Sequence, residues 1–365
     1  MRSCCFFLPS LNIGGVENVF ITYSNELSTR GYRVSFVLCK KEGDLLKNVS
    51  NDVIIYDLGG IKLRMALFPL RQYIKKRKPD VIITGGDFPN LICILATRLM
   101  KNRPRVIISK HNYRNVETKN LGWWAKFDLK LQKFLYPKAD KIIAVSKGIE
   151  RYLINELNIE PNKIAQICNP IDIDVIIKKG EQSINYTLPK DYVVFVGRLG
   201  KVKNLSLLLK AFNHVDDENL YLVIVGDGPE REPLERLAKS LPCCKKVVFI
   251  GSVSNPMPII KEAKSLILCS FSEAYPTILL EAMAFNVPIV ATPTEGAKEI
   301  LEGIEGAFLA SSFDNEDEVR DLINKAIIHK ASFMREYLYK NEKHKIVDIM
   351  EREIKKCIGY DEILK

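Results

Sequence analysis

Residues 270–292 have the sequence SFSEAYPTILLEAMAFNVPIVAT. They follow an apolar run at 265–269, which predicts a buried strand of a parallel sheet. The stretch then predicts a tight turn, a helix with Pro276 at its first position, and a second strand at 288–292. Proline suits the first helical position because the N–H group that it lacks would have no acceptor there. A strand, a turn, a helix and a strand in this order indicate an α/β fold with a parallel sheet.

The same stretch carries two carboxylates. Glu273 lies where the strand meets the helix, and Glu281 follows one to two turns into the helix. Free backbone N–H groups near Tyr275, Thr277 and Ile278 favour an anion, and carboxylates accept hydrogen bonds from vicinal hydroxyls. Phosphates and diols together describe a nucleotide sugar. An acid near a helix start is also common in buried helices of α/β proteins, so the stretch alone leaves a structural interpretation open.

The length and the charge distribution suggest two different halves. A chain of 365 residues is too long for one ordinary domain and suits two. Residues 1–186 hold 30 Lys and Arg against 17 Asp and Glu, whereas residues 187–365 hold 24 against 27. The basic half indicates either a polyanion or an anionic membrane surface as a neighbour, or helix faces whose lysines are simply solvated.

The cysteines and histidines favour a cytoplasmic protein without a metal or another cofactor. Nine cysteines, an odd number that includes several in apolar runs, are typical of reduced thiols. No C-x-x-C pair occurs, and the four histidines are scattered. The apolar run near the N-terminus is too short for a signal peptide, and no run approaches the roughly 18 apolar residues of a membrane span.

Short apolar runs alternate with helical stretches along the chain. In the first half these runs lie at 5–8, 34–38, 53–56, 81–84, 106–109, 141–146 and 164–168, and in the second half at 192–197, 221–225, 247–251, 265–269 and 288–292. This pattern predicts a parallel sheet in each half. The pattern lapses between about 175 and 190. We therefore expect a first Rossmann-like domain at 1–178, a linker at 179–190 and a second Rossmann-like domain at 191–335.

A basic loop at 197–204 follows the first strand of the second half. It would place Arg198 and Lys203 at the carboxyl end of the sheet, where open α/β sheets bind ligands. A guanidinium and an ammonium group there could neutralise a diphosphate as it leaves. Basic loops of this kind are also commonly just solvated.

In the first half, a glycine-rich loop and a histidine lie where strands end. Gly14 and Gly15 would let backbone amides approach a phosphate or an acceptor. The loop matches neither the G-x-x-x-x-G-K-[ST] nor the G-x-G-x-x-G spacing, which disfavours ATP and NAD. His111 ends the run at 106–109, and a lone histidine is more often structural than functional.

These motifs, taken in order, resemble a known family. The spacing from Glu273 to Glu281 resembles the E-x7-E signature of the retaining glycosyltransferases of family 4, and Gly-Arg-x4-Lys at 197–203 resembles their diphosphate-binding pair. The resemblance extends over nearly the whole chain and is strongest at 192–300. It implies the GT-B fold, in which two Rossmann-like domains face a central cleft and a C-terminal helix, here at 336–365, crosses back to the first domain.

The resemblance also implies the reaction and the roles of the residues. A sugar would pass, with retention and without a bound metal, from a nucleoside-diphosphate sugar, expected to be UDP-linked, to an acceptor hydroxyl. Arg198 and Lys203 would stabilise the departing diphosphate, Glu273 would bind donor sugar hydroxyls, and Glu281 the ribose diol. Arg198, Lys203 and Glu273 are the expected catalytic residues. The residues expected to bind the donor are Gly14, Gly15, His111, Arg198, Lys203, Glu273, Tyr275, Pro276, Thr277, Ile278 and Glu281.

Two departures from the family pattern bear on the identity of the donor. Ala274 stands where a glycine usually follows the first glutamate, and Glu295-Gly296-Ala297 replaces a common Gly-Gly pair.

Two basic stretches with aromatic residues, at 62–78 and 123–136, predict amphipathic helices. They could lie on an anionic membrane, which would suit a lipid-linked glycan or a surface polysaccharide precursor as acceptor and a peripheral location on the inner face of the cell membrane. The other interpretation is that their apolar faces pack on the first sheet.

Three other functions compete with the transferase. A nucleotide-sugar epimerase of the same fold would need no acceptor. An inactive scaffold subunit would not need Arg198, Lys203, Glu273 and Glu281, which this chain retains. A nucleic-acid-binding protein would suit the basic half, but the chain has no helix-turn-helix, zinc or RNP signature, so we expect no nucleic-acid partner.

Overall fold

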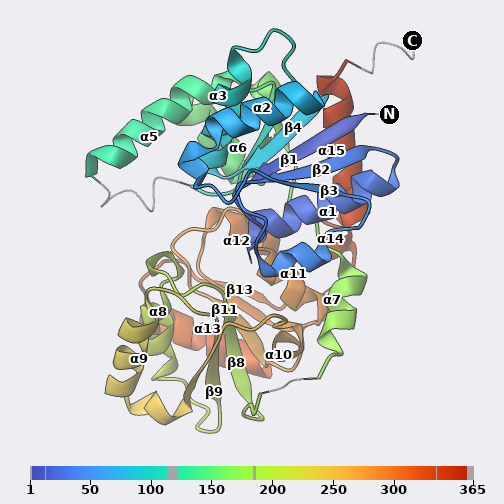
Figure 1. Ribbon diagram of the computed structural model, residues 1–365. Helices are drawn as coiled ribbons and strands as arrows, with labels where there is room; N and C mark the ends of the chain where they lie inside the picture. The colour runs from blue at the N-terminus through green and yellow to red at the C-terminus, as the bar shows by residue number, and fades with distance from the viewer. Residues whose placement is uncertain (1, 13, 114–121, 184–185, 334, 360–365) are drawn as a thin grey trace. The chain divides into compact units, whose positions relative to one another are not determined.

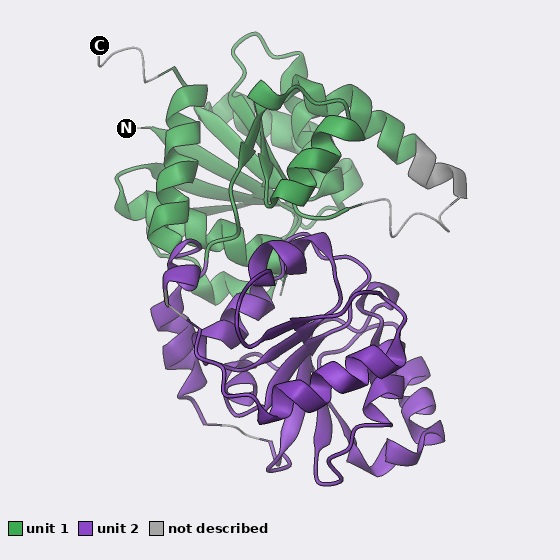
Figure 2. Cartoon of the chain, turned by 180° about the vertical axis from the view of Figure 1, so that it is seen from behind, with its two compact units in different colours: residues 1–114, 118–170, 343–365 green, residues 115–117, 171–342 purple. Residues whose placement is uncertain are grey.

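The computed structural model describes residues 2–12, 14–113, 122–183, 186–333 and 335–359. The chain forms two compact units, coloured separately in Figure 2. The first unit takes the described residues up to Pro170 and again from Lys343, and the second unit takes Ile171–Glu342. The chain therefore passes from the first unit to the second after Pro170, earlier than the expected domain end at 178. The reason is that α7 (Ile173–Gly180) packs against α10 (Met257–Lys261) and α11 (Thr277–Ala284) of the second unit.

The first unit is built on a seven-stranded sheet with the order β3-β2-β1-β4-β5-β6-β7. All of its strand pairs are parallel. The strands are β1 (Ser3–Leu8), β2 (Arg33–Leu38), β3 (Ile54–Asp57), β4 (Val81–Gly85), β5 (Arg105–Lys110), β6 (Lys141–Ala144) and β7 (Ile164–Gln166). The helices of this unit are α1 (Gly15–Thr29), α2 (Leu67–Arg77), α3 (Asp87–Arg98), α5 (Gly122–Leu135), α6 (Lys147–Asn155) and α15 (Lys343–Cys357), as Figure 1 shows.

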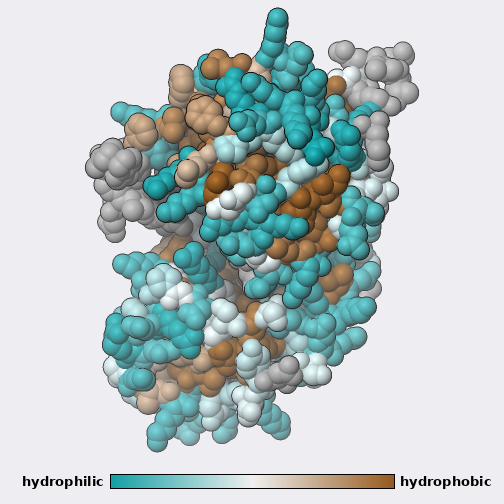
Figure 3. Space-filling model, viewed as in Figure 1, coloured by the Kyte–Doolittle hydropathy of each residue, from teal (hydrophilic) through white to brown (hydrophobic). Residues whose placement is uncertain are grey.

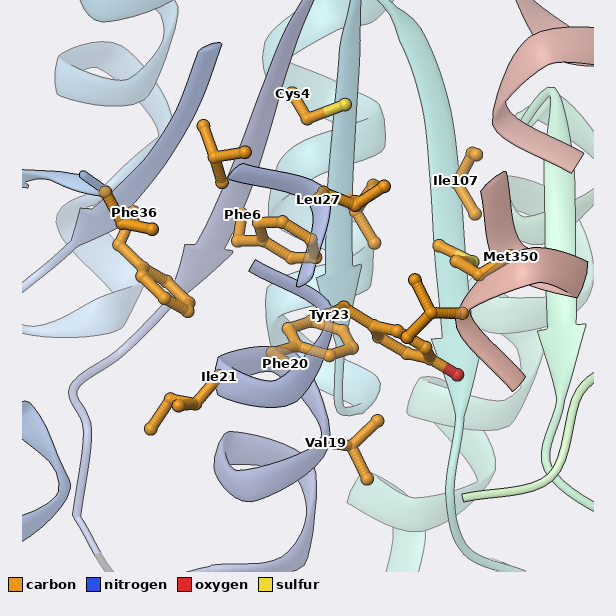
Figure 4. Close-up of a cluster of buried hydrophobic side chains, with 14 of the residues drawn as sticks. Cys4, Phe6, Val19, Phe20, Ile21, Tyr23, Leu27, Phe36, Ile107 and Met350 are labelled. Carbon is orange, nitrogen blue, oxygen red and sulfur yellow. The ribbon is translucent and has the colours of Figure 1, made fainter. Parts of the chain in front are cut away.

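The last helix of the chain completes the core of this first unit. Figure 4 shows Phe6 from the sheet, Phe20 from α1 and Met350 from α15 in one buried cluster. The ring centroids of Phe6 and Phe20 lie 5.4 Å apart, and α15 packs along α1. The C-terminal helix thus crosses back to the first domain, as the family resemblance implied. It begins at Lys343, whereas α14 (Arg335–Tyr339) belongs to the second unit.

The second unit is built on a six-stranded sheet with the order β10-β9-β8-β11-β12-β13, again with parallel pairs. The strands are β8 (Tyr192–Val196), β9 (Tyr221–Val225), β10 (Val247–Gly251), β11 (Ser265–Leu268), β12 (Ile289–Ala291) and β13 (Ala307–Leu309). Besides α7, α10, α11 and α14, its helices are α8 (Leu205–Phe212), α9 (Arg231–Ser240), α12 (Glu295–Leu301) and α13 (Glu316–Ile328).

Six short 3-10 helices complete the described structure. They are η1 (Asp44–Asn48), η2 (Leu63–Met65), η3 (Tyr136–Lys138), η4 (Pro161–Lys163), η5 (Lys201–Lys203) and η6 (Pro242–Lys246).

Both sheets have the strand order of a Rossmann-like fold. In each unit the first strand lies between the second and the fourth. The first three strands therefore extend the sheet to one side and the later strands extend it to the other, so the strand order reverses between β1 and β4 and between β8 and β11. Ligands of open α/β sheets bind beyond the carboxyl ends of the strands at such switch points. The two Rossmann-like domains expected from the sequence are confirmed, and each presents one switch point.

Candidate functional site

In the second unit, the switch point brings the two predicted motifs together. The loop after β8 carries Arg198 and Lys203, and the loop after the neighbouring strand β11 carries Glu273. The backbone N–H of Phe271 donates to the carbonyl oxygen of Val202 at 2.8 Å, which joins the two loops directly. Two loops about 70 residues apart in sequence thus lie together at the carboxyl edge of the sheet.

Lys203 and Glu273 form an ion pair at this edge. The Nζ of Lys203 lies 2.5 Å from Oε1 of Glu273, and the hydroxyl of Ser270 donates to the same oxygen at 2.6 Å. The side chains of Lys203 and Glu273 are 23% and 13% exposed. No described residue hydrogen-bonds to the other oxygen of Glu273, so this carboxylate is oriented by two protein groups and keeps an acceptor for a ligand.

Arg198 completes the predicted basic pair. Its side chain is exposed beside the same loop and has no ion-pair partner among the described residues. The arrangement at this edge therefore consists of one cation held by a carboxylate and one cation open to solvent. Both kinds of group suit the oxygens of a phosphate ligand.

Gly296 of α12 packs against the loop that carries Glu273. The N–H of Gly296 donates to the carbonyl oxygen of Glu273 at 3.1 Å. A Cβ atom at Gly296 would lie 2.6 Å from the carbonyl oxygen of Ala274, so a larger residue would displace this loop. Ala274 itself is buried here. The two departures from the family pattern, at Ala274 and at 295–297, thus meet at one contact.

Helix α11 begins one residue later than predicted. Pro276 is its N-cap and Thr277 its first residue, whereas the sequence placed Pro276 at the first helical position. The N–H groups of Thr277 and Ile278 belong to the first turn and have no intrahelical acceptor. The hydroxyl of Tyr275 accepts a hydrogen bond from Nδ2 of Asn341 at 2.6 Å, which fixes the phenol within the second unit.

Glu281 lies in α11, two turns beyond Glu273. Burial raises the pKa of its carboxyl group to about 7, and Lys179 opposes this shift. Glu281 has no hydrogen-bond or ion-pair partner among the described residues. Its carboxyl group is therefore only partly ionised at neutral pH and has unused hydrogen-bonding capacity.

In the first unit, the switch point gathers His111 and the start of α1. A Cβ atom at Gly85, the last residue of β4, would lie 2.8 Å from Val16 and 3.5 Å from Nε2 of His111. The same Nε2 is 2.7 Å from the hydroxyl of Ser109. Burial, and to a smaller extent the charge of Lys110, lower the pKa of His111 to about 4, so its imidazole is neutral at physiological pH.

The predicted glycine loop already holds a carboxylate. Gly14 is the N-cap of α1, and a Cβ atom there would lie 2.2 Å from the carboxylate of Glu17. Burial raises the pKa of Glu17, and its own backbone N–H opposes that shift. Gly15 has open space around it. A phosphate at this helix start would compete with Glu17, so Gly15 is the more accessible of the two glycines.

Sequence reasoning missed a buried ion pair behind His111. Lys110, the last residue of β5, pairs with Asp87, the first residue of α3, and their side chains are 1% and 5% exposed. Tyr136 donates its hydroxyl to Asp87 at 3.3 Å. The only signal in the sequence was Lys110 itself, a lysine between the apolar run at 106–109 and His111. Its partner Asp87 lies in another segment. Ser270 was missed too, although it stands in the quoted stretch.

The described residues contain no group of His, Cys, Asp and Glu side chains arranged to hold a metal ion. The site thus consists of cations, carboxylates, hydroxyls and backbone N–H groups.

Comparison with known proteins identifies the family of the chain. The model of "Glycosyltransferase Family 4" matches residues 13–175, and that of "Glycosyl transferases group 1" matches residues 178–345. The chain is a family 4 glycosyltransferase with the GT-B fold. The two matches follow one another along the chain, so the transferase architecture accounts for both units.

Two curated glycosyltransferases are similar to this one over most of their length. One is the Campylobacter jejuni "GalNAc-alpha-(1->4)-GalNAc-alpha-(1->3)-diNAcBac-PP-undecaprenol alpha-1,4-N-acetyl-D-galactosaminyltransferase", 29% identical over 97% of this chain and 96% of the relative. The other is the Escherichia coli "UDP-Gal:alpha-D-GlcNAc-diphosphoundecaprenol alpha-1,3-galactosyltransferase", 24% identical over 85% of this chain and 84% of the relative.

Among solved structures, Anabaena HepE in complex with UDP-glucose is similar to this glycosyltransferase with a TM-score of 0.79. It is 18% identical, and the match covers 97% of this chain and 99% of HepE. At this identity the likeness shows the shared fold.

Proposed function

We propose that this glycosyltransferase moves a sugar from a UDP-linked donor to a hydroxyl of a lipid-linked glycan, with retention and without a metal. The observation that carries the proposal is the group of Lys203, Glu273 and Ser270 at the switch point of the second sheet. A cation for a phosphate and an oriented carboxylate for sugar hydroxyls stand side by side there. Arg198 adds a second, open cation at the same edge.

Lys203 and Arg198 stabilise the leaving group in this proposal. The bond between the anomeric carbon and the diphosphate breaks, and its electron pair leaves with the diphosphate. The acceptor oxygen bonds to the anomeric carbon from the same face, and its proton passes to the departing diphosphate. An ammonium group has three donors, so Lys203 can contact a phosphate oxygen while it remains bonded to Glu273. Such prearranged charge is often the largest single contribution to catalysis.

The two glutamates bind different parts of the donor. Glu273 accepts hydrogen bonds from the sugar through its open oxygen, and Glu281 binds the ribose diol. Thr277, Ile278 and the backbone around Tyr275 and Pro276 contact the phosphates. In the first unit, the neutral His111 contacts the donor sugar, and Gly15, with Gly14, approaches the donor or the acceptor.

The names of the relatives support the choice of substrates. Both curated relatives are named for α linkages and for acceptors on diphospho-linked undecaprenol, one of them with UDP-Gal as donor. The solved relative HepE binds UDP-glucose.

A surface of the first unit supports binding to the inner face of an anionic membrane. The two basic stretches are helical, in α2 and α5, and both helices pack against α3. Leu70 and Ile74 of α2 are buried, which accords with packing on the unit, but large apolar side chains remain exposed on this surface: Met65, Phe68, Leu95, Leu99, Phe127 and Phe134. Figure 3 shows hydrophobic side chains gathered over α3 and α5. The side chains of Trp123 and Trp124 lie outside the described residues.

The proposed membrane contact is at the bilayer surface. None of the described helices has both the length and the apolarity that crossing a bilayer requires. Apolar side chains and cations on one surface are the usual elements of a reversible peripheral contact.

Donor binding followed by transfer tests the proposal. A thermal-shift panel of nucleotide sugars identifies the donor, and the purified protein is then incubated with that donor and a short-chain polyprenyl-diphosphate-linked sugar. We expect transfer that is unaffected by EDTA, and a product whose anomeric configuration, measured by NMR, equals that of the donor. An inverted product would refute retention. A rearranged sugar released without acceptor would instead identify an epimerase.

A further inference from the structure

A pocket of about 610 Å³ lies in the first unit. It is formed by α2, by the residues that lead into β4 and by those that lead into β5. Because the strands of this sheet are parallel, the starts of β4 and β5 lie at the edge opposite their carboxyl ends, where Gly85 and His111 are. The pocket is therefore at the opposite edge of the sheet from Gly85 and His111, and none of the residues to which the reaction is assigned lines it.

The lining of this pocket is strongly basic. Its charged residues are Arg71, Lys75, Lys78, Asp80, Lys101, Arg103 and Arg105. Asp80, the one acid in the lining, accepts hydrogen bonds from the backbone N–H of Ser3 at 2.7 Å and from its hydroxyl at 2.9 Å. Arg103 and Arg105 both pair with Asp140, at 2.5 Å and 3.2 Å. Two of the six cations thus share the single negative charge of Asp140.

The other four cations, Arg71, Lys75, Lys78 and Lys101, have no carboxylate partner in the part of the chain that the structure describes. Arg71 donates to the carbonyl oxygen of Leu99 at 3.3 Å, which fixes its guanidinium between α2 and the loop of Lys101. Like charges brought together from separate segments repel one another. A multivalent anion between them would remove that repulsion.

The helix dipole alone does not explain this arrangement. Cations are favoured in the last turn of any helix, and α2 ends with Lys75, Lys76 and Arg77. The guanidinium of Arg77, however, lies 4.7 Å above the ring of Tyr56, outside the pocket, and Lys76 does not line the pocket either. Lys75 lines it together with Arg71, one turn earlier, and with Lys101 from another segment.

The floor of the pocket is firm and apolar. Ile74, Pro79 and Pro104 are buried beneath the cations. Proline rings fix the backbone φ angle, so the two loops lose little entropy when a ligand binds. The volume falls within the range of roughly 300–1,000 Å³ that small-molecule sites occupy.

We propose that this pocket binds a phosphate-bearing anion with two or more negative charges. Arg71 supplies a planar fork for two oxygens, and Lys75, Lys78 and Lys101 supply point charges around it. The anion is either a free diphosphate or the headgroup of an anionic phospholipid, since both present the same oxygens. The inference does not depend on the transferase reaction.

Calorimetry with two probes tests this site. The protein carries Arg198→Ala and Lys203→Ala, so that the proposed donor site does not bind the probes. The first probe is pyrophosphate, and the second is dihexanoyl phosphatidic acid at a concentration at which it is monomeric. We expect saturable binding of at least one probe. Tighter binding of pyrophosphate identifies a free anion as the ligand, and tighter binding of the phosphatidate identifies a lipid headgroup.

Matched charge variants locate the binding. Lys75→Gln with Lys78→Gln should lower the affinity more than tenfold, since each exposed cation near the anion contributes about a fivefold factor. Lys76→Gln with Arg77→Gln removes the same charge from the same helix outside the pocket and should lower it far less. If the first pair fails to fold, as judged by circular dichroism, Lys101→Gln replaces it. Absence of binding by both probes, or equal losses in the two pairs, would overturn the proposal.

Discussion

The two units each hold a lysine–carboxylate pair at the carboxyl edge of a Rossmann-like sheet, but the pairs differ in burial. Lys110 and Asp87 of the first unit are 1% and 5% exposed, and Tyr136 bonds to the same carboxylate. Lys203 and Glu273 of the second unit are 23% and 13% exposed, and one oxygen of Glu273 stays open to a ligand. The same two charges are thus enclosed in one unit, whereas in the other they stay accessible, as the proposed binding site requires.

Burial decides which role a pair can take. A fully buried pair has lost its hydration and cannot turn toward a ligand without leaving a charge unpaired. A partly exposed pair keeps water as an alternative partner and can exchange it for a phosphate or a hydroxyl. Lys110 also lies next to His111 and helps to keep that imidazole neutral, so the buried pair acts on the first switch point through position and charge.

The largest effect should come from breaking the buried pair. We expect Lys110→Met to lower the free energy of unfolding by about 3–5 kcal/mol, because Asp87 would stay buried after losing the ammonium group of Lys110. Urea denaturation measures this change. Lys203→Met is the matched control in the partly exposed pair and should cost about 1 kcal/mol or less. Equal losses in the two variants would show that burial does not distinguish the pairs.

For turnover, we expect the larger effect at the partly exposed pair of the second unit and not at the buried pair. Replacing Arg198 or Lys203 by Ala should lower kcat by about 10²–10³, the usual effect of removing one preorganised charge-stabilising group. The exposed control Lys201→Ala, on the same loop, should leave kcat within about threefold. Near wild-type transfer by both the Arg198 and the Lys203 variant would refute the assignment of the diphosphate.

The next effect concerns pH. Glu281 has a pKa of about 7 in the empty site, and a ribose diol binds to its ionised form, so the affinity for a nucleoside diphosphate should rise as pH increases through 7. Below that pH the rise approaches tenfold per unit. His111, at about 4, does not titrate in this range.

Calorimetry between pH 5.5 and 8.5 measures this dependence. Glu281→Gln is the control, since it retains the titration of the ligand itself and should lose the remaining dependence. Glu273→Gln should keep it and impair binding of the complete donor instead. The assignment of Glu281 to ribose fails if both variants bind free nucleoside diphosphate equally.

Glu281 also affects stability in a direction that follows from its raised pKa. The folded protein holds a proton on this group between about pH 4.5 and 7 that the unfolded chain releases. Stability therefore decreases as pH rises through this window, by at most about 3 kcal/mol. Glu281→Gln should remove the decrease and so stabilise the empty protein above pH 7 but not below pH 5. Thermal unfolding at both pH values measures this difference.

The smallest effect per residue should be at the membrane. Each cation near an anionic surface contributes roughly 1 kcal/mol, so the wild-type protein should sediment with anionic vesicles at low salt and be released at high salt. Changing Lys75, Lys76, Arg77 and Lys78 to Gln should weaken binding, and Phe68→Ser should weaken it without changing the charge. Vesicle co-sedimentation measures both. A protein that stays in the supernatant at low salt would point to a soluble acceptor.

The sequence predicted the parts of the site that lie close together in the chain. Glu273, the start of α11 and the strands around them depend on local pattern, and the errors there were shifts of one residue at Pro276 and at the ends of β11 and β12. The juxtaposition of Lys203 with Glu273 also follows from strand order, because adjacent parallel strands place their following loops at one edge.

Tertiary contacts decided what the sequence could not predict. The chain passes to the second unit after Pro170 because α7 packs on α10 and α11, which its own composition does not reveal. Asp87 and Lys110 are 23 residues apart, and neither shows from its neighbours that the other is buried against it. The carboxylate of Glu17 over Gly14 is likewise a matter of side-chain direction.

The crossing of α15 back to the first unit has a consequence for synthesis. Domains usually fold in the order in which they leave the ribosome, at about 5–20 residues per second. Here Ile346, Val347 and Met350 belong to the core of the first unit, but they emerge only after all of Ile171–Glu342 has been made. The first unit must therefore wait on the order of ten seconds or more with its α1 face uncovered, so the domain that begins first is completed last.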